Sequence, residues 1–237
     1  IIVSNEELQK KFGGEIIPHV RNEDIFKKEL YPRTELREKL GYLDSDKVIL
    51  FIGTVRRHKG ILELSEALQQ IRDNKVKLCI IGDIDDYQIK KSLNKLDKNR
   101  FINLSNIDFN DIPFYLSIGD LICLYQNPTS PISKFQMPSK VTDALAMGIP
   151  LLTSNAKPLK NLENVGFLKC VDNKKDLANS IQKELEKKST RNYREYLLST
   201  HSYKYGLIKI NEIVQKNLSN QKNTFPHKLF ERYINDM

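Results

Sequence analysis

The 237-residue sequence contains no tryptophan, three cysteines and four histidines, and it has no apolar run long enough to span a bilayer. Cys79, Cys123 and Cys170 each lie in an apolar, strand-like run, and their number and spacing fit neither a disulfide framework nor a metal site. We therefore expect buried, reduced thiols of a cytoplasmic protein. The histidines are equally scattered and predict no metal centre.

Several familiar motifs are also missing. The sequence has no G-x-G-x-x-G turn, no P-loop and no G-x-S-x-G elbow, and it matches no nucleic-acid-binding module. It begins IIVSN, with neither a methionine nor a signal peptide, which indicates a piece of a longer protein. The formal net charge of +8 favours anionic partners such as nucleotides, phosphorylated substrates or an acidic membrane surface. Nucleic acid would also suit this charge, but because no module signature supports it, it is not expected as a partner.

Apolar runs alternate with helical patterns between residues 47 and 188, which predicts an α/β fold with a doubly wound, parallel, Rossmann-like sheet. Residues 1–46 are expected to be the end of a preceding domain and a hinge. Residues 189–237 are expected to form a helical extension, either partly mobile or docked on the flank of the sheet. The six expected strands are 48–52, 78–81, 101–104, 121–125, 150–153 and 167–171. A short apolar strand is also expected over residues 15–20, and a polar helix over residues 83–98.

The loop GTVRRHKG, residues 53–60, follows the first of these strands and precedes a helix. Ligands of open α/β sheets bind outside the carboxyl ends of the strands, so this loop is a candidate site. Its basic side chains, Arg56, Arg57 and Lys59 among them, suit a diphosphate. The alternative is an exposed basic loop that contributes only to solubility.

The stretch PSKVTDALAMGIP, residues 138–150, predicts a helix with Pro138 in its first position and Gly148 at its end. Ser139, Lys140 and Asp143 are expected on its exposed face, where they can hold phosphate and hydroxyl groups together. The preceding loop, residues 130–138, is a candidate cover for a small polar ligand. The alternatives are a surface helix with a solvated Lys/Asp pair and a plain connecting loop.

A strand ending in G-T-x-x-x-x-K-G, followed further along by P-S-K-x-x-D-x-L-A-x-G-x-P, resembles the C-terminal, donor-binding half of a GT-B glycosyltransferase. The resemblance is to the retaining group 1 enzymes of glycosyltransferase family four, and it covers residues 1 to about 188. It implies that the sheet is one half of a GT-B fold. The other Rossmann-like domain, which carries the acceptor site, would be missing, so we expect weak nucleotide-sugar binding and no turnover.

The resemblance also implies roles for individual residues. Lys59, with Arg56 or Arg57, would bind the donor diphosphate and stabilise it as it leaves, and Asp143 would bind the donor ribose. Phe135 stands where many members have a glutamate that faces the donor sugar, and the base would lie near residues 104–106. The candidate site residues are Gly53, Thr54, Arg56, Arg57, Lys59, Leu104, Asn106, Lys134, Phe135, Gln136, Ser139, Lys140 and Asp143.

The resemblance implies a UDP-sugar as donor, without a cofactor or a metal. It also implies a saccharide or lipid-linked acceptor in polysaccharide or glycolipid assembly. We then expect the protein in the cytoplasm, either free or at the inner face of the membrane. Two other functions stay open at this point. One is a sugar-nucleotide 2-epimerase, which product analysis of the parent protein would distinguish. The other is a non-catalytic nucleotide-binding or partner-binding domain, which the departures at Phe135 and Asp143 favour.

Overall fold

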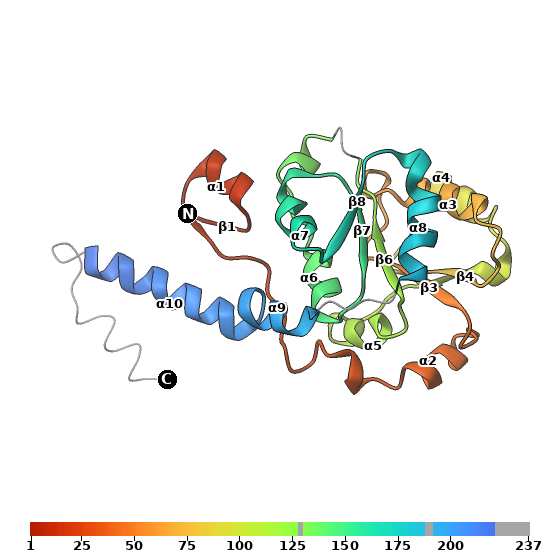
Figure 1. Cartoon of the computed structure of the whole chain (residues 1–237), viewed down its shortest axis with the longest axis horizontal. Helices are drawn as coiled ribbons and strands as arrows, with labels where there is room; N and C mark the ends of the chain where they lie inside the picture. Colours follow the sequence, from red (N-terminus) through yellow and green to blue (C-terminus); the bar gives the residue numbers. More distant parts are fainter. Residues whose placement is uncertain (128–129, 188–191, 221–237) are drawn as a thin grey trace.

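The computed structural model describes residues 1–127, 130–187 and 192–220. In this part of the chain, six parallel strands form one sheet in the order β5-β4-β3-β6-β7-β8 (Figure 1). The expected doubly wound, six-stranded parallel sheet is therefore confirmed. The strand order reverses between β3 and β6, which is where such sheets place their ligands. The strands are β3 (Lys47–Ile52), β4 (Val76–Ile81), β5 (Phe101–Leu104), β6 (Leu121–Leu124), β7 (Leu151–Ser154) and β8 (Leu168–Val171).

Helices cover both faces of the sheet and bury an apolar core on each side (Figure 1). Strand β3 shows why its continuous apolar run is needed. Val48, Leu50 and Ile52 point into one core while Ile49 and Phe51 point into the other, and all five are almost fully buried. One face carries α3 (Ile61–Gln70), α4 (Tyr87–Leu93) and α8 (Leu177–Glu186), and the other carries α2 (Arg33–Lys39), α5 (Ile112–Leu116), α6 (Ser139–Ala146), α7 (Lys160–Asn164) and α9 (Tyr193–Thr200).

Three local expectations differ from the structure. The helix expected over residues 83–98 is shortened to α4, because the Asp86 carboxylate accepts the N–H groups of Gln88 and Ile89 and so begins the helix. Pro138 precedes α6 as its N-cap, with an extended ψ of 134°, and is not its first helical residue. The strand expected over 15–20 is reduced to two residues.

The N-terminal segment forms a small separate layer. Strand β1 (Ile2–Val3) pairs in parallel with β2 (Glu15–Ile16), and α1 (Glu6–Phe12) lies between them in sequence. Beyond β2 the chain runs past the C-terminal segment, where Arg21 forms a bridge with Ser202. These two linker segments therefore meet beside the main sheet.

The C-terminal extension is described for residues 192–220 only, so the expectation for 188–191 and 221–237 lies outside the described residues. Helix α9 docks on the flank of the sheet, with Tyr193 and Leu197 buried in the core beside α6. Helix α10 (Tyr203–Asn220) extends away from the sheet toward the N-terminal segment (Figure 1), where Lys216 lies 2.5 Å from Glu15.

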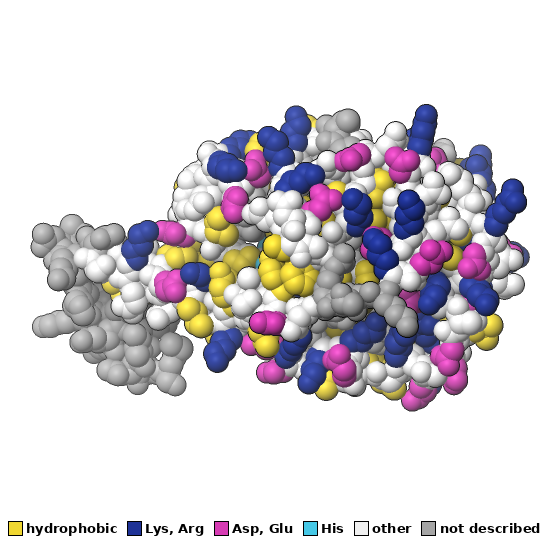
Figure 2. Space-filling model, in the orientation of Figure 1, with side chains coloured by type: hydrophobic (Ala, Val, Ile, Leu, Met, Phe, Trp, Pro, Cys, Tyr) yellow, Lys and Arg dark blue, Asp and Glu magenta, His cyan; other side chains and the backbone are white. Residues whose placement is uncertain are grey.

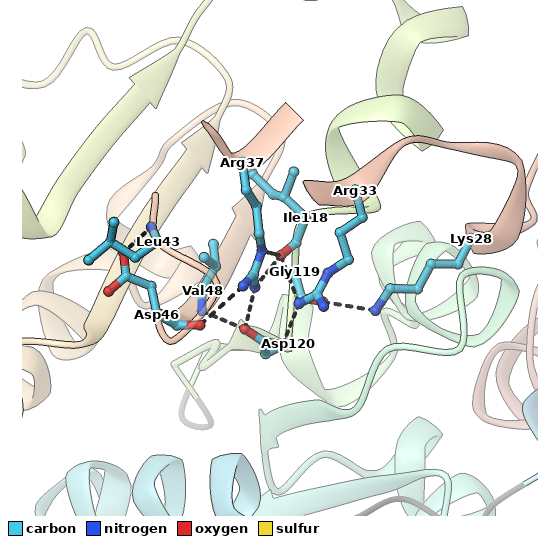
Figure 3. A network of polar contacts seen from close by, with 9 residues as sticks. All are labelled: Lys28, Arg33, Arg37, Leu43, Asp46, Val48, Ile118, Gly119 and Asp120. Carbon is cyan, nitrogen blue, oxygen red and sulfur yellow. Dashed lines mark hydrogen bonds and ion pairs between the residues drawn. The ribbon is translucent and has the colours of Figure 1, made fainter. Parts of the chain in front are cut away.

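A polar network fastens the segment around α2 to the amino edge of the sheet (Figure 3). The Asp120 carboxylate, just before β6, accepts from Arg33 and Arg37, both at 2.6 Å, and from the backbone N–H of Val48 at 2.8 Å. The Lys28 ammonium donates to the Gly119 carbonyl at 3.1 Å. This network lies opposite the edge where a ligand is expected.

The surface and the cysteines follow the sequence pattern. The three cysteines are free and buried, as expected. Figure 2 shows lysine and arginine side chains spread over the visible face of the sheet domain and mixed with acidic ones. Among the described residues, no helix is both long and apolar enough to cross a membrane.

Candidate functional site

The turn after β3 and the loop after β6 lie against each other at the reversal of strand order. The His58 carbonyl accepts the N–H of Asn127 at 3.1 Å. Gly60 has a φ of 82°, and a Cβ built there would lie 1.6 Å from the Tyr125 carbonyl oxygen. Only glycine fits this close approach of two backbones. The turn predicted from GTVRRHKG is thus positioned at the ligand edge of the sheet.

The basic side chains of this turn have different surroundings. The Lys59 ammonium donates to the Thr54 carbonyl at 2.8 Å. Burial lowers the pKa of Lys59, and the nearby charges of Arg56 and Lys140 lower the same pKa further. Arg57 instead makes a two-pronged ion pair with Asp86, at 2.6 and 3.2 Å. The turn therefore presents Arg56 and Lys59, while Arg57 is held at the start of α4.

Helix α6 contributes a third cation to the same place. A Cβ built on Gly53 would lie 3.4 Å from the Cε atom of Lys140, so the Lys140 side chain lies directly against the turn. The two sequence motifs, which are far apart in the chain, are therefore brought into contact. Ser139, at the first position of α6, is half-buried, and its carbonyl accepts from an Arg21 guanidinium nitrogen at 3.3 Å.

Asp143 is not on an exposed face of α6, and that expectation is wrong. The residue is 1% exposed. Its Oδ1 atom accepts a hydrogen bond from Arg21, and its Oδ2 atom lies 3.1 Å from the Lys140 ammonium. Arg21 comes from the linker, which covers this part of the helix, and nothing in the local sequence indicates that contact. The role of Asp143 as a ribose ligand stays a prediction.

Leu104 and Asn106 lie at the end of β5, which β4 separates from β3 in the sheet. The Leu104 carbonyl accepts the Gly82 N–H at 2.8 Å, and the Asn106 N–H, at a φ of 55°, donates to the Asp83 carboxylate at 3.3 Å. Gly82 joins this strand end to the basic turn, since a Cβ there would lie 2.5 Å from the Gly53 oxygen.

The loop before α6 is held by the N-terminal helix α1. The Phe135 carbonyl accepts from the Asn5 amide at 2.9 Å, and the Lys11 ammonium lies 4.5 Å from the centre of the Phe135 ring. Lys134 and Gln136 are exposed. Phe135 is therefore turned toward α1, and the structure shows no contact between these three residues and the basic turn among the described contacts.

The described residues also contain a pocket of about 400 Å³ between α1, α7 and α9, lined by Asn5, Lys10, Met137, Lys157 and Tyr196 among others. None of the predicted site residues lines this pocket. Within the described part of the chain, no group of three or more histidine, cysteine or acidic side chains could hold a metal ion. Any ligand of the turn would meet amines and guanidinium groups.

Comparison with known proteins gives a consistent result. The family model described as "Glycosyl transferases group 1" matches residues 32–197. TuaC of Bacillus subtilis strain 168, whose name assigns it to teichuronic acid biosynthesis as a glycosyltransferase, is 26% identical over 130 residues. That match covers 55% of this chain and 30% of the relative.

Two solved structures share the fold. A glycosyltransferase from Rickettsia africae ESF-5 matches with a TM-score of 0.76 and 21% identity, over 94% of this chain and 64% of that one. Anabaena Alr3699/HepE, solved in complex with UDP and glucose, matches with a TM-score of 0.70 and 19% identity, over 92% and 62% of the two chains. The chain thus spans less than two thirds of the length of each of these relatives.

Proposed function

Because the chain belongs to the group 1 glycosyl transferases, we propose that it binds the diphosphate of a nucleotide-sugar donor at the turn after β3. The family membership confirms the resemblance that the two sequence motifs indicate. One observation supports the site most strongly: Lys59, Arg56 and Lys140 gather around the turn at Gly53, where the strand order reverses. Ligands of such sheets bind at this reversal, and clustered cations suit a diphosphate.

The proposed reaction is transfer of the sugar with retention at its anomeric carbon. The bond from this carbon to the diphosphate oxygen breaks, and its electron pair stays on the diphosphate. The acceptor oxygen forms the new glycosidic bond, and its hydroxyl proton passes to an oxygen of the departing diphosphate. Lys59 and Arg56 stabilise the charge that grows on the leaving diphosphate. Burial of Lys59 strengthens this effect, because a charge interaction is worth more in a less polar environment.

We further propose a UDP-sugar as donor and a polysaccharide or glycolipid as acceptor. The complex of HepE with UDP and glucose supports the first, and the assignment of TuaC to teichuronic acid biosynthesis supports the second. The acceptor site would belong to a second domain of a longer protein. The 237-residue chain alone should then bind donor without transferring sugar, and robust transfer by this chain would contradict that part of the proposal.

Calorimetric titration of the chain with UDP, GDP, ADP and dTDP tests the donor site. We expect UDP to bind, and Lys59→Ala to weaken binding about 10- to 100-fold, because a charge-assisted hydrogen bond contributes about 1.5–3 kcal/mol. Lys95→Ala is the matched control, since Lys95 is exposed in the turn that leads to β5 at the opposite edge of the sheet. Equal effects of both substitutions, or no diphosphate binding by this chain or its longer parent, would refute the site.

A further inference from the structure

The amino edge of the sheet carries a second group of cations, apart from the basic turn. They converge on the two carbonyls that precede Asp120, at the turn between α5 and β6 (Figure 3). Lys28, from the 3-10 helix η1 (Lys28–Leu30), donates to the Gly119 carbonyl at 3.1 Å. Arg33 of α2 donates to the adjacent Ile118 carbonyl at 3.4 Å. Figure 3 shows the Lys28 side chain pointing toward the Arg33 guanidinium, so the two positive charges are neighbours.

This group of cations has too few negative charges around it. Arg33 and Arg37 both pair with Asp120, at 2.6 Å each. Within the described part of the chain, no carboxylate contacts the Lys28 ammonium. The pKa of Lys28 is lowered to about 8, first by burial and then by the charge of Arg33, and the charges of Asp120 and Glu29 oppose this shift without cancelling it. Three cations therefore share one carboxylate, and Lys28 lacks a counter-ion.

The two neighbouring cations also keep hydrogen-bond donors that no described residue uses. Arg33 donates to Ile118 and Asp120 through its Nη2 atom, while its Nε atom is a buried donor without a partner. Lys28 uses one of its three N–H donors, on the Gly119 carbonyl. Buried polar groups are nearly always paired, so an unpaired donor calls for a specific explanation such as a bound ion. An oxyanion would supply both acceptors and the missing negative charge.

We propose that Lys28 and Arg33 form a second anion site, which binds a phosphate group, either as inorganic phosphate or as a phosphate monoester. An ammonium beside a guanidinium suits phosphate oxygens, and the Arg33 side chain is 35% exposed, so a ligand reaches it from solvent. Asp120 keeps its bond to Arg33. The site lies at the edge of the sheet opposite the turn after β3, so it does not depend on the proposed function. Bound phosphate ties η1 to the start of α2.

A phosphate titration of the 237-residue chain, followed by NMR, tests this site separately from the basic turn. The backbone amide signals of Lys28 and Arg33 report on the proposed site, and those of residues 53–60 report on the turn. We expect Lys28→Met to weaken phosphate binding at the proposed site about tenfold, because one charge-assisted hydrogen bond is lost. The adjacent, exposed Lys27 gives the matched control, and Lys27→Met should leave that affinity unchanged. Lys59→Ala should affect the signals of the turn alone.

Arg33→Lys is the second variant, and it keeps the positive charge beside Asp120. It should also weaken binding, because a lysine replaces the planar fork of donors with a single ammonium. Titration with glycerol phosphate distinguishes the two sources: tighter binding than inorganic phosphate would identify a monoester as the ligand, and weaker binding the free ion. Absence of a saturable phosphate-dependent shift at Lys28 and Arg33 in the unsubstituted chain would overturn the proposal. An unchanged affinity in Lys28→Met would also overturn it, and would assign Lys28 only to the carbonyls after α5.

Discussion

The clearest stability prediction concerns Asp120, because its carboxylate connects α2 and the start of β3 to the segment just before β6 (Figure 3). It accepts from Arg33 and Arg37 of α2 and from the first apolar residue of β3, Val48. The side chain of Arg37 is 3% exposed, that of Arg33 is 35% exposed and that of Asp120 is 23% exposed. The perturbation is Asp120→Asn, which keeps the shape of the side chain and removes its charge.

The expected cost follows from this burial. Removing one partner of a fully buried ion pair costs about 3–5 kcal/mol, because the other charge stays buried without compensation. Asp120 is partly exposed, so water screens part of the interaction, and an amide oxygen still accepts one bond. We expect a loss of about 2–4 kcal/mol in the free energy of unfolding. For a chain of this size each kcal/mol lowers the melting temperature by about 2–4 °C.

Urea denaturation followed by circular dichroism measures the effect, with a calorimetric melt as a second probe. Glu35→Gln is the control, because it also removes one carboxylate from an ion pair of α2. Glu35 and Lys39 are 59% and 68% exposed, so solvent screens that pair and its loss should change the free energy of unfolding very little. A loss below about 1 kcal/mol for Asp120→Asn, or one equal to that of Glu35→Gln, would refute the reasoning.

Two further predictions concern His201 and Gly60. Burial lowers the pKa of His201 to about 4, and the nearby charge of His19 contributes to this shift. Between pH 6.5 and 4 the unfolded chain therefore binds more protons than the folded chain. The free energy of unfolding should fall by up to about 3 kcal/mol as the pH drops through this range. In urea titrations at pH 7 and 4.5, His201→Gln should reduce the difference in the free energy of unfolding between the two pH values. An unchanged difference would contradict the prediction. Gly60→Ala should destabilise the chain by several kcal/mol and abolish UDP binding, because its Cβ would overlap the Tyr125 carbonyl. Gly41→Ala is the matched control, with a φ of 76° and open space around the new Cβ, so it should cost only about 1 kcal/mol; equal losses in urea would argue against the clash.

The order of strands and helices could be predicted because the signals for it are local. The run from Val48 to Ile52 is apolar at every position, which fits a strand buried on both faces. Glycine and proline mark the ends of elements for conformational reasons that need no tertiary contact, as Gly148 does with its φ of 61° after α6. The basic turn and the start of α6 could be assigned to one edge of the sheet, because the carboxyl ends of parallel strands all lie at that edge.

The sequence by itself determined the α/β alternation, the six apolar strands and the family, because these rest on periodicity and on short motifs. Only the tertiary structure decided which charges meet. Arg21 reaches Asp143 across 122 positions of sequence, and Asp120 reaches Arg37 across 83. Such pairs depend on the path of a linker that has no periodic pattern. That path buries the carboxylate expected on the surface, and it leaves Lys140 beside the turn where the donor diphosphate is proposed to bind.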